Sequence, residues 1–162
     1  MDAIELRELR DEPAHAGAIL ELARRLPEWF TERGIEQLKV DVAHQQGYIA
    51  VSGNVALGFV TYYVAEGVAR IGWMGVAPDH HRKGIGRSLI EHLCAELHAR
   101  ELPAVQVDTL GDSVDYEPYA LTRAFYRGVG FRDHQRVKQD DPEWPERLTL
   151  RRALSSVSSK TR

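Results

Sequence analysis

The sequence predicts an α/β fold of the α+β kind, built on a mixed, mostly antiparallel central sheet of about seven strands. Residues 47–78 form a series of segments rich in β-branched and aromatic side chains, which is typical of consecutive strands. Residues 84–99 then switch to the apolar spacing of an amphipathic helix. Because several strands precede this helix in a run, a mixed sheet is favoured over a purely parallel one.

The first third of the chain is predicted to hold one strand and two helices. Residues 3–10 alternate apolar and polar side chains, as in a strand with one solvated face. Residues 13–26 place their apolar side chains on one helical face. A second helix is expected over 31–45, with Thr31 as its N-cap.

The strand-rich middle is predicted to be a three-strand meander. Its strands are expected at 48–54, 55–67 and 68–78. Turn residues separate them, first Ser52-Gly53-Asn54 and then Glu66-Gly67, as hairpin connections require.

After residue 78 the predicted elements alternate between helix and strand. They are a helix at 84–99, a strand at 105–110, a helix at 119–129, and strands near 131–138 and 147–153. On the helix at 119–129 we expect Leu121, Ala124, Phe125 and Val129 to face inward. Residues 1–154 are expected to form a single domain, and the tail 155–162, which has no apolar face, is expected to be disordered.

Composition narrows the functional class. The chain has 162 residues, 43% hydrophobic and 28% charged, which is typical of a globular protein. Its 21 Lys and Arg against 24 Asp and Glu give a net charge of −3, which argues against a general nucleic-acid binder. No apolar run approaches the roughly 20 residues of a membrane span, so no membrane partner is expected. The N-terminus lacks a signal-peptide pattern, and we therefore expect a cytoplasmic protein.

The sulfur and imidazole groups do not predict a metal site. Cys94 is the single cysteine, so an internal disulfide and a Cys-based zinc site are excluded. His92 and His98 lie six residues apart and would occupy different faces of their helix. We expect them, with His80 and His81, to be solvated side chains, and no metal is predicted.

The segment that carries most chemical information is APDHHRKGIGRSLI, residues 77–90, between a predicted strand and a predicted helix. Two closely spaced glycines allow the backbone to approach a ligand, and the helix start offers N–H donors and a positive dipole end. Three cations, Arg82, Lys83 and Arg87, lie beside them. Together these features predict an anion site suited to a pyrophosphate.

Two familiar phosphate motifs do not fit this loop. A Walker P-loop needs Lys and then Ser or Thr after its last glycine, but Gly86 is followed by Arg87 and Ser88. The dinucleotide fingerprint needs glycine where the chain has Leu89.

The loop resembles that of a known family. Residues 81–86, HRKGIG, resemble the acyl-CoA pyrophosphate loop of the GNAT N-acetyltransferases, Q/R-x-x-G-x-G/A, and GVAPDH at 75–80 is similar to its entry. A second segment, ALTRAFYRGVGF at 120–131, is similar to the family's late helix. The order of predicted elements matches the whole family domain over roughly residues 3–153.

The resemblance implies a GNAT-like acyl-CoA fold with helices on both faces of the sheet, acetyl-CoA as cosubstrate, and direct transfer to a primary amine in a ternary complex. It also implies that the fourth strand splays from the fifth and that pantetheine lies in the gap. The residues that would bind the cofactor through main-chain groups or cations are Met74, Gly75, Val76, His81, Arg82, Lys83, Gly84, Ile85, Gly86, Arg87, Ser88 and Tyr119.

The chain departs from the family pattern at three points. His81 stands where the family usually has Gln or Arg, and Tyr119 stands where it often has an Asn that contacts pantetheine. The fourth predicted strand, ARIGWMGV, lacks the carboxylate that many relatives use to guide a proton-accepting water.

Two catalytic residues are predicted. Tyr126 matches the family tyrosine near the CoA sulfur, and its phenol is a suitable acid for the leaving thiolate. A main-chain N–H near Val76 would hold the oxyanion. Asp108, on the strand at 105–110, is the leading candidate for general base. A chain of waters without a dedicated base, and a purely structural carboxylate, remain open alternatives.

The acceptor is expected to be a small-molecule amine bound by Glu28, Trp29, Asp112 and Tyr116. The acidic segment at 108–117 would favour an acceptor with additional positive charge, although a solvated loop that contacts nothing explains it as well. Two further functions stay open: a non-catalytic acyl-CoA-binding or sensor domain, and an N-acetyltransferase of proteins or peptides. A homodimer is among the expected assemblies.

Overall fold

The computed structural model describes residues 3–154, which contain seven strands, four α-helices and two short 3-10 helices. In chain order these elements are β1 (Ile4–Glu8), η1 (Leu9–Asp11), α1 (Ala14–Arg24), α2 (Glu32–Asp41), β2 (Gln46–Ser52), β3 (Val55–Ala65), β4 (Val68–Val76), η2 (Pro78–His80), α3 (Ile85–Ala99), β5 (Ala104–Leu110), α4 (Glu117–Gly128), β6 (Arg132–Lys138) and β7 (Glu146–Ala153). Every predicted element is present, with boundaries shifted by a few residues. The predicted tail at 155–162 lies outside the described residues.

The strands form one seven-stranded sheet in the order β1-β2-β3-β4-β5-β7-β6. The pairs β1–β2, β2–β3, β5–β7 and β6–β7 are antiparallel. The predicted mixed, mostly antiparallel sheet is therefore confirmed.

The chain separates into two compact units, which we describe in turn. Unit 1 holds residues up to Tyr63 together with Ile71–Glu96, and unit 2 holds Val64–Arg70 together with the residues from Leu97 onward. The expectation of a single domain over 1–154 stays a prediction.

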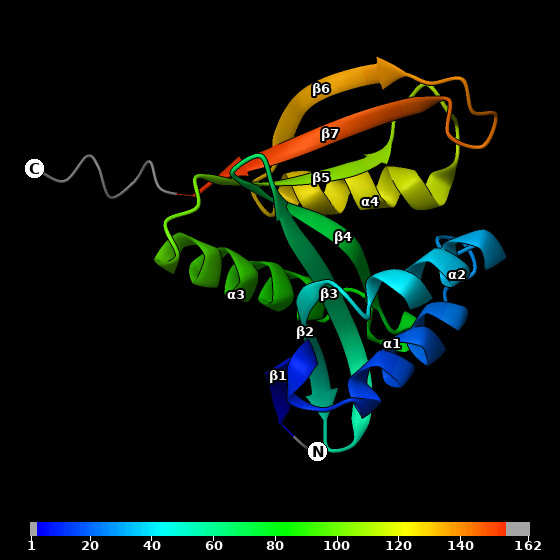
Figure 1. The fold of residues 1–162 in the computed structure, drawn as a ribbon. Coiled ribbons are helices and arrows are strands. Elements are labelled where there is room, and N and C mark those ends of the chain that lie inside the picture. Colours follow the sequence, from blue (N-terminus) through cyan, green and yellow to red (C-terminus); the bar gives the residue numbers. More distant parts are fainter. Residues whose placement is uncertain (1–2, 155–162) are drawn as a thin grey trace, which may run out of the picture. The chain divides into compact units, whose positions relative to one another are not determined.

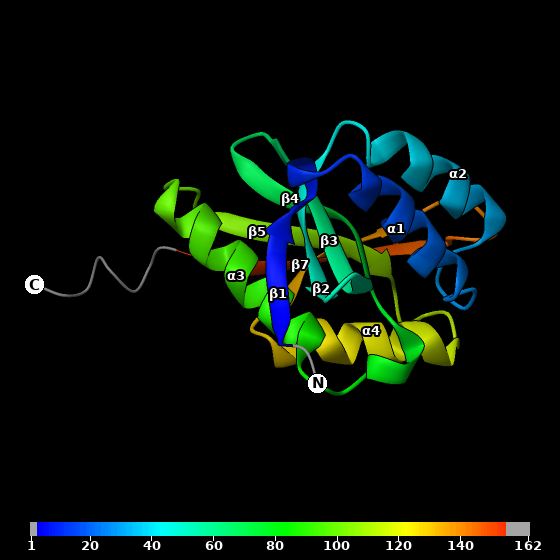
Figure 2. The ribbon, with the colours of Figure 1, turned by 90° about the horizontal axis from the view of Figure 1, so that it is seen from below.

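In unit 1, helices cover both faces of the strands (Figures 1 and 2). Helices α1 and α2 lie over one face, where their apolar side chains share a core with Ile49 and Val51 of β2 and Phe59 of β3. Helix α3 lies over the opposite face, since a Cβ at Gly58 would meet the side chains of Ile85 and Leu89. Each such aliphatic side chain contributes about 1.5–3 kcal/mol when fully buried.

Local capping and turns follow the sequence closely. The Thr31 hydroxyl accepts a hydrogen bond from Gly34 N at 3.0 Å, as expected for the N-cap of α2. Between β3 and β4, Glu66 and Gly67 have φ of 54° and 78°. Two successive positive φ values are the mark of a type I′ hairpin, which matches the twist of the strands.

In unit 2, β7 lies between β5 and β6, and β6 forms the end of the sheet. Strand β6 is almost wholly exposed and carries mainly charged and polar side chains. Helix α4 packs against β5, and its Tyr126 contacts Phe131, the residue just before β6.

The buried face of α4 differs from the prediction. Leu121 is 47% exposed and Ala124 is exposed, whereas Arg123 and Tyr126 are buried. The prediction was wrong for Leu121 and Ala124 because it weighted hydrophobicity alone, whereas Val129 is buried as predicted and Phe125 is half-buried. Arg123 can be buried because its Nη1 donates a hydrogen bond of 2.6 Å to Leu110 O, which satisfies part of the guanidinium.

Candidate active site

The loop between β4 and α3 is anchored at both ends and exposed between them. Ala77 is buried, and its N–H donates to Leu57 O at 2.8 Å. Ile85, the first residue of α3, is also buried. Residues 81–84 between these anchors are all exposed. The backbone of residues 81–84 is therefore accessible, while both ends of the loop are held in the core.

The backbone of the loop has the conformation expected of an anion site. Arg82 and Gly84 have φ of +67° and +84°, in the left-handed region. Alternation of this kind turns successive N–H groups toward a common point. No atom lies within 4 Å of the position that a Cβ on Gly84 would take, so the space beside this glycine is open. Ser88 N donates to Gly84 O at 2.9 Å, which begins the helical hydrogen bonds of α3.

The charges around the loop are of one sign. Arg82, Lys83 and Arg87 are exposed, and the sequence has no carboxylate between Asp79 and Glu91. The first N–H groups of a helix have no acceptor within the helix and carry its positive dipole end. These residues therefore fit a diphosphate, and His81 to Ser88 would hold it.

His81, which replaces the usual first residue of the motif, folds back on its own strand. Its Nε2 lies 2.8 Å from Val76 O. Since a carbonyl oxygen only accepts, Nε2 carries the proton and donates. The ring also makes an edge-to-face contact with Trp29, with ring centroids 5.9 Å apart. A predicted cofactor residue and a predicted acceptor residue are thus in contact.

The last three residues of β4 are only partly buried. Met74, Gly75 and Val76 are only half-buried, in contrast to the buried centre of β3. A Cβ on Gly75 would lie 3.0 Å from the Phe59 ring and 3.1 Å from Leu26. A side chain at position 75 would therefore crowd these two residues, so packing favours a glycine here.

Trp73, which the sequence analysis did not single out, joins β4 to α2. Its Nε1–H donates to Asp41 Oδ2 at 2.8 Å, and its ring stacks on Phe30 with centroids 5.8 Å apart. Glu28, predicted to contact the acceptor, is exposed in the connection between α1 and α2. The signal available in the sequence was the position of Trp73 directly before Met74, Gly75 and Val76, which are predicted to bind the cofactor.

In unit 2, Tyr126 is buried, with 5% of its surface exposed. Its ring contacts Phe125 and Phe131 edge to face, at centroid distances of 5.2 and 5.3 Å. Burial, with a smaller contribution from Tyr119, raises the pKa of the Tyr126 phenol above its usual value. The phenol is therefore a weaker acid than a solvated tyrosine, and it carries its proton at neutral pH as any tyrosine does.

Asp108 is exposed on β5 and has a partner on the neighbouring strand. Its Oδ1 accepts a hydrogen bond of 2.6 Å from Thr149 Oγ1, and the two residues are directly opposite in the β5–β7 pairing. The second carboxylate oxygen is available in principle to another donor, so a role as base stays a prediction.

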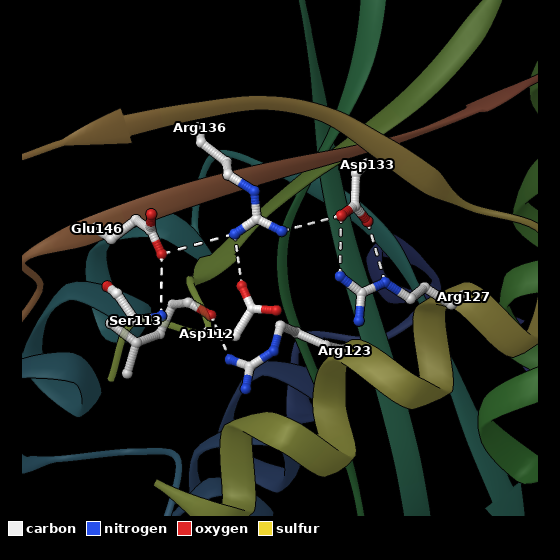
Figure 3. A network of polar contacts seen from close by, with 8 residues as sticks. Asp112, Ser113, Arg123, Arg127, Asp133, Arg136 and Glu146 are labelled. Carbon is white, nitrogen blue, oxygen red and sulfur yellow. Dashed lines mark hydrogen bonds and ion pairs between the residues drawn. The ribbon is translucent and has the colours of Figure 1, made fainter. Parts of the chain in front are cut away.

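Asp112 belongs to a network of ion pairs (Figure 3). Arg136 on β6 donates to Asp112 Oδ1 and, at 3.1 Å, to Asp133 Oδ2. Arg127 on α4 binds both oxygens of Asp133, each at 3.0 Å. The hydrogen bond from Arg136 is the main reason why the pKa of Asp112 lies below its usual value. The charge of Asp112, predicted to contact the acceptor, is thus locally compensated.

Glu146, at the start of β7, holds the loop that follows β5. Its Oε1 accepts from Ser113 N at 3.2 Å and lies 3.7 Å from Arg136 Nη1. Its side chain lies against Gly111, where a Cβ would overlap it. These long-range contacts were not recognisable in the sequence.

Three aromatic rings meet in unit 2. Tyr116 and Tyr119 have centroids 5.8 Å apart, and Tyr119 contacts Trp144 edge to face at 5.4 Å. Burial raises the pKa of Tyr119 to about 12. Tyr116 and Tyr119 were predicted in acceptor and cofactor roles respectively, and the structure brings them together with Trp144, which the sequence analysis missed.

Comparison with known proteins identifies the family. The family model described as acetyltransferase (GNAT) domain matches residues 42–133, more than half of the chain. The chain belongs to the GNAT acetyltransferase family. A search of curated proteins found no match. The GNAT match includes β4, the loop and α4, which carry the predicted motifs.

Solved structures share the GNAT fold. A GNAT-family protein from Desulfovibrio desulfuricans has 20% identity and a TM-score of 0.84, over 94% of this chain and all of that chain. The ribosomal-protein-S18-alanine N-acetyltransferase of Escherichia coli has 18% identity and a TM-score of 0.72, over 96% and 95%. An aminoglycoside 6′-N-acetyltransferase complexed with coenzyme A has 14% identity and a TM-score of 0.73, over 93% and 97%.

The described residues contain neither a metal-binding cluster nor a membrane-spanning helix. Within residues 3–154, no group of three or more His, Cys, Asp or Glu side chains is arranged to hold a metal ion. No α-helix in the same part of the chain has the length and apolar character needed to cross a membrane.

Proposed function

We propose that this acyltransferase moves the acetyl group of acetyl-CoA to the primary amine of a small molecule, directly and in a ternary complex. The observation that carries the proposal is the loop at 81–88. It combines left-handed backbone at Arg82 and Gly84, open space beside Gly84 and an excess of positive charge at a helix start. These are the features that a diphosphate requires.

In this proposal the chain supplies binding and proton transfer. The cosubstrate supplies the acetyl group as a thioester. A C–N bond forms, the C–S bond breaks, the amine loses a proton and the sulfur gains one. Main-chain groups of residues 74–76 bind the pantetheine amides, and an N–H near Val76 stabilises the developing oxyanion.

We assign the proton donor for the sulfur to Tyr126 and the proton acceptor for the amine to Asp108. The match to the family motif supports the first role, and the phenol carries its proton at neutral pH, as a donor must. Burial raises the pKa of this phenol, so it is a weaker acid than usual and would give up its proton only as it hydrogen-bonds the departing thiolate. Asp108 is exposed, and its bond to Thr149 fixes its orientation.

The acceptor class is a separate part of the proposal. Among the structural neighbours, one is named for an aminoglycoside and another for a ribosomal protein. A small-molecule amine is our proposal, and a protein or peptide acceptor is the alternative that the experiment must separate from it. A cytoplasmic location, a homodimer and the absence of a nucleic-acid partner also stay predictions.

The test is a panel of amines with acetyl-CoA, read by release of free thiol. The panel holds diamines, monoamines, aminoglycosides and peptides with N-terminal alanine or internal lysine. Thermal shift with acetyl-CoA, NAD and ATP tests the cosubstrate separately. Acetyl-CoA at about 100 times its Kd should add about 2.7 kcal/mol to the free energy of unfolding. A larger shift with NAD than with acetyl-CoA would overturn the proposal, and turnover of peptides alone would replace the small amine with a protein acceptor.

A further inference from the structure

Unit 2 contains a group of three aromatic side chains that the chemistry above does not use. We call Tyr116, Tyr119 and Trp144 the aromatic cluster. Tyr116 is the N-cap of α4 and Tyr119 lies in its first turn, whereas Trp144 comes from the connection between β6 and β7. Their centroid separations of 5.8 and 5.4 Å are those of aromatic contacts.

The backbone beneath the rings is ordered by its own hydrogen bonds. Gln139 Nε2 donates to Trp144 O at 2.9 Å, and Gln139 N donates to Pro145 O at 2.8 Å. Tyr119 N donates to Tyr116 O at 3.1 Å. Tyr116 is nevertheless 39% exposed, and Trp144 is half-buried. The cluster is therefore a fixed aromatic surface that is partly open to solvent.

The segments that carry the rings are acidic throughout. Residues 113–119 and 139–145 contain no Lys or Arg. They contain five carboxylates, which we call the acidic rim: Asp115, Glu117, Asp140, Asp141 and Glu143. Asp112 does not belong to it, since Arg136 compensates its charge. Both segments that carry the rings therefore have a net negative charge.

Aromatic faces beside carboxylates favour a cation. A ring attracts a cation through its quadrupole, and nearby carboxylates add long-range attraction. A neutral acceptor would gain nothing from the rim, and an anionic one would be repelled. Resting on the proposed function, we propose that the aromatic cluster and its acidic rim bind a second, positively charged amino group of the acceptor, which makes the substrate a diamine or polyamine.

The experiment compares 1,5-diaminopentane with 1-aminopentane, which has the same length and one charge fewer. We expect a higher kcat/KM for the diamine, and a preference that weakens as salt rises. Tyr116→Leu removes the ring and keeps an apolar side chain, whereas Tyr116→Phe keeps the ring. Tyr116→Leu should lower kcat/KM for the diamine by about tenfold, and by clearly more than it lowers kcat/KM for the monoamine. Phe should retain most of the preference.

Two further variants, calorimetry and thermal unfolding serve as controls for this test. Tyr63→Leu removes an exposed tyrosine of β3 outside the cluster and should leave the preference intact. Glu117→Gln with Asp140→Asn should reduce the preference without the loss of a ring. Calorimetry with 1,5-diaminopentane in the presence of CoA should show weaker binding to Tyr116→Leu than to Tyr116→Phe. Thermal unfolding of each variant identifies a variant that is not folded.

The outcomes separate this inference from the proposed function. Equal kcat/KM for both amines in the wild type, or equal losses for both in Tyr116→Leu, would overturn the inference while acetyl transfer itself stands. If none of the amines in the panel leads to release of thiol, the proposed function itself is overturned. A diamine preference that survives both the ring and the rim substitutions would place the second charge elsewhere.

Discussion

The imidazole of His81 donates from Nε2 to the main-chain oxygen of Val76, over 2.8 Å. The bond closes a ring of backbone from the last residue of β4 to the start of the loop. It ties the entrance of the loop to the strand whose main chain is proposed to bind pantetheine. The residue that departs from the family motif therefore has a structural explanation in this chain.

Replacing His81 by Ala should weaken CoA binding by about fivefold, because a lost hydrogen bond of this kind corresponds to about 1 kcal/mol. Calorimetric titration with CoA measures it. His80→Ala is the matched control, since the His80 ring instead lies 3.2 Å from Asp79. Equal effects of the two substitutions would show that the bond to Val76 does not order the loop.

Gly86→Glu should abolish detectable CoA binding, with a loss of at least about 100-fold, because it places a carboxylate where a diphosphate is proposed to bind. Folding should be retained, since Glu has a higher helix propensity than Gly and suits a helix start. Gly17→Glu, in an exposed and uncrowded position of α1, is the control. A folded Gly86→Glu protein with wild-type affinity would remove this loop from the cosubstrate site.

Tyr126→Phe should lower turnover by about 100-fold or more and leave CoA affinity nearly unchanged, as expected for loss of a proton donor. The measurement is kcat at saturating substrates, with a single-turnover experiment to show that chemistry limits the rate. If kcat stays near that of the wild type under these conditions, Tyr126 is a core residue only.

The same residue makes a prediction about stability at high pH. Since burial raises the pKa of Tyr126, the unfolded chain ionises first, near pH 10, while the folded chain retains its proton. The free energy of unfolding should therefore fall as pH rises above 10. Denaturant unfolding at pH 8 and pH 11 should show a smaller fall in Tyr126→Phe than in the wild type. Parallel curves would mean that the phenol is solvated.

Asp112→Asn should alter stability at low pH. Arg136 lowers the pKa of Asp112, so the ion pair stabilises the folded state above the ordinary carboxyl pKa of about 4 and is lost as pH falls below it. Because both side chains are nearly half exposed, the effect should be under about 1 kcal/mol. The free energy of unfolding, measured with denaturant, should differ less between pH 7 and pH 2.5 in the variant than in the wild type. A difference as large as that of the wild type would assign the acid sensitivity to other carboxylates.

Most of the fold could be predicted because its signals are local. The two-residue Glu66-Gly67 turn, the Thr31 cap and the switch from strand to helix spacing at α3 each depend on neighbours in sequence. The face of α4 could not be predicted in the same way. Arg123 is buried on account of a carbonyl acceptor 13 residues away, which no periodicity reveals.

The candidate site shows the same division. The loop at 81–88 is one continuous segment, so its glycines, cations and helix start were visible together. The compensation of Asp112 by Arg136 and the contact of Tyr119 with Trp144 depend on pairing between strands. The sequence therefore shows that the loop is acidic. It does not show that part of this charge is neutralised by an arginine that lies far away along the chain.

The contact between Gly111 and Glu146 constrains how this protein can evolve. A side chain at 111 would overlap that of Glu146, which in turn binds Ser113 N and approaches Arg136. Gly111→Ala alone should therefore be deleterious, yet become tolerable once residue 146 is shortened. Such dependence of one substitution on another is epistasis, and it predicts that position 111 acquires a side chain only in descendants in which residue 146 has already been shortened.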